Sequence, residues 1–164
     1  MTDVNPISIT LVDYQDSKQM ALLIQQLSHY AMDDMGGGKD LPEAVKQRLL
    51  IDLPQQQQNF SLLAWVGEEC VGMTNCLWGY STFAAQSLVN IHDLGVQKEF
   101  RGMGISTALL RAVEEHAGTR NACKVTLEVL GNNHIAKASY SQFGFNVYEL
   151  TEGAGKAEFW QKYL

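Results

Sequence analysis

The sequence has few of the features of a secreted, a membrane-bound or a nucleic-acid-binding protein. Its three cysteines are an odd number without metal-ligand spacing, which predicts reduced thiols, no metal site and a cytoplasmic location. No run of about 18 apolar residues is present, and the start lacks the basic-then-apolar plan of a signal peptide, so we expect no membrane partner. Basic residues number 12 against 18 acidic ones, and the net charge of −6 argues against nucleic acid as a partner.

What the sequence does contain fits one folded domain. A length of 164 residues, 46% of them hydrophobic and 18% charged, is enough for a core of ordinary size. No internal repeat or low-complexity linker divides it, so we expect a single domain over residues 1–164. Residues 1–94 carry 4 basic and 11 acidic side chains, whereas residues 95–164 carry 8 and 7. The acidic part is either a solvated face or a surface that tolerates a cationic ligand.

Hydrophobic periodicity predicts an α/β (α+β) fold with a mixed, centrally parallel sheet of about seven strands and about four helices. The expected strands cover residues 7–11, 61–66, 70–82, 87–96, 124–129, 146–150 and 157–163. The expected helices are one capped by Asp16 or Ser17, one that starts at the capping sequence Asp40-Leu41-Pro42-Glu43, one after residue 100, and one over residues 135–143 that Gly144 ends.

The most informative segment is a glycine-rich turn between an expected strand and an expected helix, Arg101-Gly102-Met103-Gly104-Ile105-Ser106-Thr107. A helix start leaves several N–H groups unpaired and carries a partial positive charge. The two glycines let the backbone approach an anion, the arginine adds a guanidinium, and the two hydroxyl residues add donors. The turn therefore predicts a phosphate or diphosphate site, with a plain glycine-rich connection as the alternative.

Two common phosphate-binding motifs fit this turn poorly. A P-loop ends in Gly-Lys-Ser/Thr, and the turn contains no lysine. A dinucleotide fingerprint needs a third glycine where Thr107 stands, and it normally opens the first βαβ unit of a domain. Nucleoside triphosphate hydrolysis and dinucleotide binding are therefore the weaker interpretations.

Two motifs together resemble those of the GNAT N-acetyltransferases. The turn matches the family's Arg/Gln-x-x-Gly-x-Gly/Ala signature, with Ser106 as the last small residue. The second motif, Asn-x-x-Ala-x-x-x-Tyr-x-x-x-Gly-Phe, is present as Asn133, Ala136, Tyr140, Gly144 and Phe145. Residues 23–30 and 88–104 also look similar to the diamine/polyamine acetyltransferases. The chain departs from that subgroup where His92 replaces an expected acid and Ala31 follows Tyr30.

The resemblance implies a centrally splayed GNAT sheet, acetyl-CoA as co-substrate, no metal, and a homodimer. It implies that the backbone of the last expected strand before the turn pairs with the pantetheine arm and the thioester carbonyl, and that the turn holds the diphosphate. The residues implied at the coenzyme are Leu94, Val96, Arg101, Gly102, Met103, Gly104, Ile105, Ser106, Thr107, Asn133 and Ala136.

Direct acetyl transfer to an amine needs a proton donor for the leaving thiolate and a base for the amine. The resemblance implies Tyr140 as the general acid, because a tyrosine hydroxyl titrates near ~10 and is protonated at neutral pH. Strand alternation places His92, not Asp93, on the face of Leu94 and Val96, which favours His92 as base or water-relay member. Asp93 or a chain of waters is the alternative base.

We expect the amine pocket to include Tyr30, Asp33, Tyr80 and Phe83, although aromatic residues at such spacing also fit a hydrophobic core. The expected function is acetyl transfer from acetyl-CoA to a primary amine of a small molecule, with a cationic molecule as one option. A protein or peptide amine as acceptor, a non-catalytic acyl-CoA sensor, and a nucleotide-binding module are the alternatives.

Overall fold

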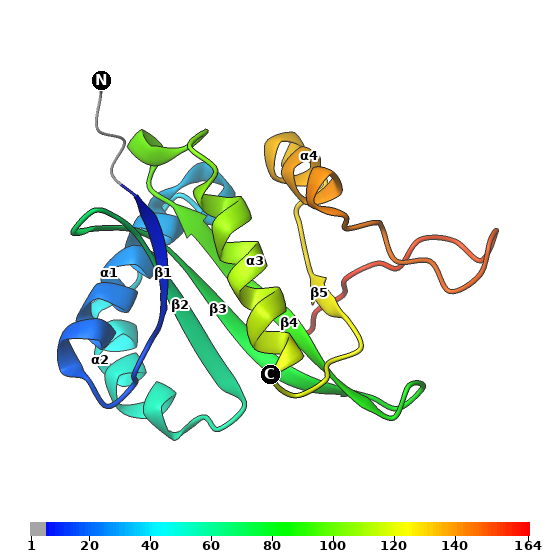
Figure 1. Ribbon diagram of the computed structural model, residues 1–164, viewed down its shortest axis with the longest axis horizontal. Helices are drawn as coiled ribbons and strands as arrows, with labels where there is room; N and C mark the ends of the chain where they lie inside the picture. Colours follow the sequence, from blue (N-terminus) through cyan, green and yellow to red (C-terminus); the bar gives the residue numbers. More distant parts are fainter. Residues whose placement is uncertain (1–5) are drawn as a thin grey trace. The chain divides into compact units, whose positions relative to one another are not determined.

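The computed structural model describes residues 6–164 (Figure 1), which divide into two compact units. The first, called the sheet unit here, ends at Leu127, and the second, the C-terminal unit, covers Glu128–Leu164. Each unit is described by itself, and the single domain over residues 1–164 stays a prediction. Within residues 6–164, none of the helices combines the length and the apolar composition that a membrane span requires.

The sheet unit contains one mixed sheet of five strands in the order β1-β2-β3-β4-β5. The strands are β1 (Ile7–Leu11), β2 (Asn59–Val66), β3 (Glu69–Ser81), β4 (Gln86–Val96) and β5 (Val125–Leu127). Neighbours from β1 to β4 pair antiparallel, and β5 pairs parallel with β4 at one edge. A mixed sheet is therefore confirmed, but its parallel pair lies at the edge and not at the centre.

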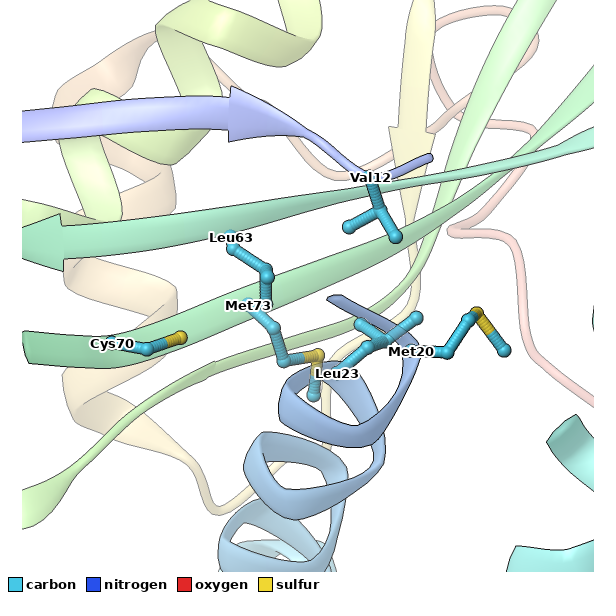
Figure 2. Close-up of a cluster of buried hydrophobic side chains, with 6 residues drawn as sticks. All are labelled: Val12, Met20, Leu23, Leu63, Cys70 and Met73. Atoms are coloured by element: carbon cyan, nitrogen blue, oxygen red, sulfur yellow. The ribbon is translucent and has the colours of Figure 1, made fainter. Parts of the chain in front are cut away.

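Two long helices cover the sheet on opposite faces (Figure 1), α1 (Ser17–Met32) and α3 (Ile105–Gly118). Asp16 caps α1 as expected, because its side chain accepts hydrogen bonds from the N–H groups of Lys18 and Gln19. The apolar face of α1 packs on β2 and β3, where it forms a cluster of buried side chains (Figure 2): Val12, Met20, Leu23, Leu63, Cys70 and Met73.

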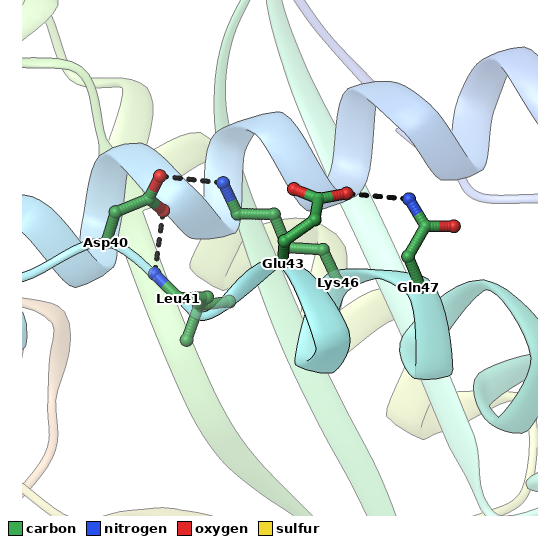
Figure 3. A network of polar contacts seen from close by, with 5 residues as sticks. All are labelled: Asp40, Leu41, Glu43, Lys46 and Gln47. Atoms are coloured by element: carbon green, nitrogen blue, oxygen red, sulfur yellow. Dashed lines mark hydrogen bonds and ion pairs between the residues drawn. The ribbon is translucent and has the colours of Figure 1, made fainter.

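The second helix, α2 (Glu43–Asp52), does not start with the expected capping box. Pro42 is its N-cap residue, and no side chain caps it. Asp40 instead accepts hydrogen bonds from the N–H of Leu41 and from Nζ of Lys46, both at 2.7 Å (Figure 3). The reason is the register: the helix begins one residue after the proline, so Asp40 is too far from the first turn to cap it and pairs with a lysine one turn inside.

The C-terminal unit contains α4 (His134–Phe143), which ends at Gly144 as expected. The strands expected over residues 146–150 and 157–163 do not form, and the segment has one isolated antiparallel bridge between Glu149 and Lys156. The sheet therefore has five strands and not about seven. Alternation is a local signal, but a strand also needs a neighbour that accepts and donates backbone hydrogen bonds, which this segment lacks within the C-terminal unit.

Candidate active site

The edge of β4 that faces β5 is the first part of the candidate site. β5 pairs with β4 only from Val89 to Ile91, and residues 92–96 of β4 extend beyond the last pair. The N–H of Gln97 donates to the carbonyl of Val71 on β3 at 2.8 Å. Since backbone groups of a strand alternate in direction, those of Leu94 and Val96 point away from β3, toward the side on which β5 has stopped pairing.

The glycine turn and the start of α3 form the second part. Gly102 and Gly104 have φ angles of 78° and 84°, and a Cβ atom built on either would have no heavy atom within 4 Å. Within residues 6–164 no side chain caps α3, and its first turn has no acidic residue. The N–H of Ala108 makes the first helical bond, to Gly104, so the three N–H groups before it lie outside the helical ladder.

This turn fits a phosphate group. Three consecutive N–H donors, of Ile105, Ser106 and Thr107, stand at the positive end of the helix dipole. Ile105 is buried and anchors the start of α3, whereas Met103 is 43% exposed. The open space in front of both glycines leaves the backbone accessible to an anion.

Arg101 links the turn to the end of α1. Its Nη2 donates to Oδ2 of Asp33 at 2.7 Å, and its Nε donates to the carbonyl of Val96 at 3.0 Å. The Arg101 guanidinium holds the pKa of the Asp33 carboxyl below its usual value, so Asp33 is ionised at neutral pH. A residue expected at the coenzyme and one expected at the amine therefore form an ion pair with each other.

A cavity of about 450 Å³, called the α1 cavity here, lies between the end of α1 and the end of β4. It brings together Tyr30 and Asp33, two of the four residues expected at the amine. Tyr30 packs directly on Gly95, where a Cβ atom would lie 3.0 Å from Cβ of Tyr30. Burial raises the pKa of Tyr30, and the charges of Asp93 and Asp33 add to the effect, so its hydroxyl stays a donor.

The other two residues expected at the amine do not reach this site. Tyr80 lies near the end of β3 and is 63% exposed, and Phe83, in the turn before β4, is 91% exposed. Neither lines the α1 cavity or the second cavity described next. The contact of Tyr80 and Phe83 with an amine stays a prediction.

A β-bulge in β4 changes the expected positions of His92 and Asp93. Ile91 lies opposite Cys76 and Asp93 lies opposite Asn75, which leaves His92 without a partner on β3. Both His92 and Asp93 line a second cavity of about 160 Å³ on the side of α1 and α2, called the leucine cavity here. The prediction that alternation separates His92 from Asp93 is therefore wrong, although the catalytic role of His92 stays a prediction.

A chain of hydrogen bonds across three strands leads to Asp93, and it was not predicted from the sequence. The hydroxyl of Tyr14 lies 2.7 Å from Oγ of Ser61, which donates to Oδ1 of Asn75 at 2.6 Å. Nδ2 of Asn75 then donates to Oδ2 of Asp93 at 2.9 Å. The signal that could have found it is the presence of Ser61 and Asn75 inside otherwise apolar strands, because buried polar groups need partners.

In the C-terminal unit, α4 contains the other expected residues. Asn133 caps α4, and its Oδ1 accepts a hydrogen bond from the N–H of Ala136 at 3.2 Å. The Tyr140 ring lies edge-on to Phe145, with 6.0 Å between ring centroids. The contacts of Asn133, Ala136 and Tyr140 with a coenzyme stay predictions.

Two of the three cysteines, Cys70 and Cys76, are unsuited to act as nucleophiles. Cys70 and Cys76 are buried, and burial raises the pKa of their thiols to about 11 and about 12. Both are therefore thiols and not thiolates at neutral pH. Among residues 6–164, no group of three or more histidine, cysteine or acidic side chains is arranged to hold a metal ion.

Comparison with known proteins shows which family and which structures this chain is similar to. A model of the acetyltransferase (GNAT) family matches residues 24–145. A thialysine N-epsilon-acetyltransferase of Caenorhabditis elegans is 31% identical over 91 residues, 56% of this chain and 56% of that protein. The uncharacterized N-acetyltransferase YycN of Bacillus subtilis is 26% identical over 148 residues, 85% of this chain and 93% of that protein. The crystal structure of a probable acetyltransferase has a TM-score of 0.76 at 18% identity and covers 95% of this chain and 99% of that one.

The family match covers most of the chain, including the end of β4, the glycine turn and α4. The structural likeness extends over nearly the whole length of both chains and concerns the fold. The matched segment spans about half the length of the nematode relative, 56%. By the family match, the chain belongs to the acetyltransferase (GNAT) family.

Proposed function

We propose that this protein is an acetyl-CoA-dependent N-acetyltransferase, which transfers the acetyl group directly to the primary amine of a small, positively charged molecule. The observation that carries the proposal is the uncapped start of α3 with its glycine turn, placed directly after the edge of β4 that β5 pairs only as far as Ile91. The nematode relative is named for an amine acceptor. Asp93, the carboxylate that lines the leucine cavity, supports a cationic substrate.

The chain's own groups that would hold the coenzyme are mostly backbone groups. When bound, acetyl-CoA supplies an acetyl group that is activated as a thioester. The N–H groups at the start of α3 would bind phosphate oxygens. Leu94 offers both its N–H and its carbonyl to the pantetheine arm, whereas the carbonyl of Val96 already accepts from Arg101, so Val96 contributes its N–H.

Tyr140 is the proposed general acid, which donates its hydroxyl proton to the leaving sulfur. If the thiol resembles cysteine at ~8.5 and tyrosine titrates near ~10, the transfer is uphill by about 2 kcal/mol. Positioning of the hydroxyl next to the sulfur has to offset this cost.

The base acts on the amine, which must be neutral to attack. A lysine-like amine is unprotonated about once in a thousand at neutral pH, which costs about 4 kcal/mol. His92 and Asp93 both line the leucine cavity. We assign His92 as the base or as part of a water relay, and Asp93 as the group that orients the ammonium.

Direct transfer, without a covalent enzyme intermediate, is supported by the state of the thiols. An acetyl-cysteine intermediate needs a thiolate that can reach the acetyl donor. Cys76 is 1% exposed, and burial raises the pKa of its thiol to about 12. The homodimer and the single-domain arrangement that the resemblance implies are part of the same proposal.

The test is a thiol-release assay with purified protein, acetyl-CoA and a panel of amines. We expect stoichiometric thiol release and an N-acetylated product detected by mass spectrometry with at least one small amine. Faster turnover of peptide amines than of small amines would contradict the small-molecule acceptor and indicate a protein acceptor. Tight binding of acetyl-CoA without thiol release for any amine or peptide would contradict the enzymatic proposal and identify an acyl-CoA sensor.

A further inference from the structure

The leucine cavity is mostly hydrocarbon. Aliphatic side chains from α1, α2, the following 3₁₀ turn and β3 form its walls: Leu23, Ile24, Leu27, Leu49, Leu53 and Leu77. Among the described residues that line it, Asp93 is the one carboxylate, and none is lysine or arginine. The part of the chain that the structure describes therefore gives this cavity a mainly apolar surface with a single carboxylate.

The hydrogen-bond chain fixes the Asp93 carboxylate in a defined orientation. The hydroxyl of Ser61 has one proton, which it donates to Asn75, so Ser61 must accept the proton of Tyr14. The amide of Asn75 then donates to Asp93. All three donors point in the direction of Asp93, so the chain fixes the orientation of the carboxylate, and the carboxylate can still accept bonds from a ligand.

The volume limits what can enter beside this carboxylate. A cavity of ~150 Å³ lined by leucine, isoleucine and phenylalanine holds one benzene molecule, and the leucine cavity measures about 160 Å³. A body of about six carbon atoms therefore fills it. A second ammonium on such a body would find no second carboxylate among the residues that line the cavity, and an unpaired buried charge is costly.

We infer that the acceptor is a primary monoamine with a compact hydrocarbon body of about five to seven carbon atoms, whose ammonium pairs with Asp93 and whose body fills the leucine cavity. This inference rests on the proposed function and narrows it from small cationic amines to apolar monoamines. Asn75 is then a positioning residue, because it acts on the substrate through Asp93.

The first experiment compares pentylamine with 1,5-diaminopentane at saturating acetyl-CoA. The two acceptors have the same carbon chain and differ by one ammonium. We expect kcat/KM to be at least tenfold higher for pentylamine, and benzylamine to behave like pentylamine. Equal or better turnover of the diamine would overturn the inference and leave the proposed function intact.

Absence of thiol release with every amine would overturn the proposed function, and the site is then tested by calorimetry. A lower Kd for pentylamine than for 1,5-diaminopentane would support the inference, and equal Kd values would overturn it. The two proposals can therefore fail separately.

Two variants locate the site. Asn75→Leu removes the support of Asp93, so KM for pentylamine should rise about tenfold with little change in kcat. Thr74→Val is the matched control: its hydroxyl donates to the main-chain carbonyl of Asp93 and not to the carboxylate, so KM should change less than twofold. Equal effects in both variants would assign Asn75 a purely structural role and overturn the positioning role.

Leu49→Phe tests the same cavity if Asn75→Leu fails to fold, because Leu49 lies on α2, which has no fully buried residue. The larger ring takes up cavity volume, so turnover of benzylamine should fall at least tenfold while that of ethylamine is retained. An unchanged ratio of the two amines would place the acceptor outside the leucine cavity.

Discussion

At the scale of single residues, Arg101 combines two contacts within the protein with a position at the start of the glycine turn. It binds Asp33 and the carbonyl of Val96, and it begins the turn that fits a phosphate. The Arg101 side chain is 49% exposed and the Asp33 side chain 25%, so the ion pair itself contributes little to stability. Its value is positional, because it connects the end of α1 to the glycine turn.

Replacement of Arg101 separates a phosphate contact from this positional role. Arg101→Ala should raise the Kd of coenzyme A about tenfold, since a charge-assisted hydrogen bond contributes about 1.5 kcal/mol. Asp33→Asn removes the same ion pair and keeps the guanidinium, so its Kd should change less than twofold. Equal weakening in both variants, measured by calorimetry, would mean that Arg101 acts only by holding α1 near the turn.

Tyr140→Phe tests the general acid. The ring and its edge-on contact with Phe145 are kept, and only the proton donor is lost. We expect kcat to fall by about 100-fold or more, as general acids typically contribute, and the Kd of coenzyme A to stay within twofold. Tyr163→Phe, at an 85% exposed position, is the control. A large loss of coenzyme affinity in Tyr140→Phe would make the hydroxyl a binding group.

At the scale of elements, the Asn-x-x-Ala-x-x-x-Tyr-x-x-x-Gly-Phe motif of α4 is a helix with both ends capped. Asn133 caps the start, and Gly144, with φ of 117°, ends the helix. The N–H of Gly144 donates to Ser141, and that of Phe145 donates to Tyr140, which is the Schellman arrangement with its usual apolar contact. Much of the motif's spacing therefore follows from the length of the helix, and this made the prediction of α4 accurate.

The α3 helix carries a pH-dependent contribution to stability. The His116 ring packs against Phe60 in a tilted arrangement with 4.3 Å between ring centroids, and its pKa is lowered, mainly by burial and also by Arg120. The folded state therefore favours the neutral ring. The stabilisation is complete above the unfolded pKa of ~6.5 and is lost as the pH falls from there toward the lower folded pKa.

His116→Phe should remove this dependence. The difference in unfolding free energy between the protein and the variant, measured in urea from pH 8 to pH 5, should change in favour of the variant as the pH falls below ~6.5. His134→Phe, outside this cluster at an exposed position of α4, is the control. A constant difference over the range would show that His116 has the same pKa in both states.

At the scale of the whole molecule, the order of the main helices and strands was predictable as far as Phe143, because each has a strong period and clear ends. The prediction of the two closing strands was wrong, since apolar and polar residues alternate in 146–150 and 157–163 but these segments have no partner strand in their unit. The glycine turn was predictable because the residues that form it are consecutive in the sequence. The chain from Tyr14 to Asp93 was not, because it depends on which residues of β2, β3 and β4 lie opposite one another.

The unpaired position of His92 also determines which side chains of β4 lie on each face of the sheet. Val89 and Ile91 lie opposite Trp78 and Cys76, on the side of α3, whereas Asp93 lies opposite Asn75, on the other side. In a strand of strict alternation, a residue two places after Ile91 would join it in the hydrophobic layer beneath α3. Because His92 is inserted, β4 contributes apolar side chains to the face of the sheet beneath α3 and the Asp93 carboxylate to the opposite face.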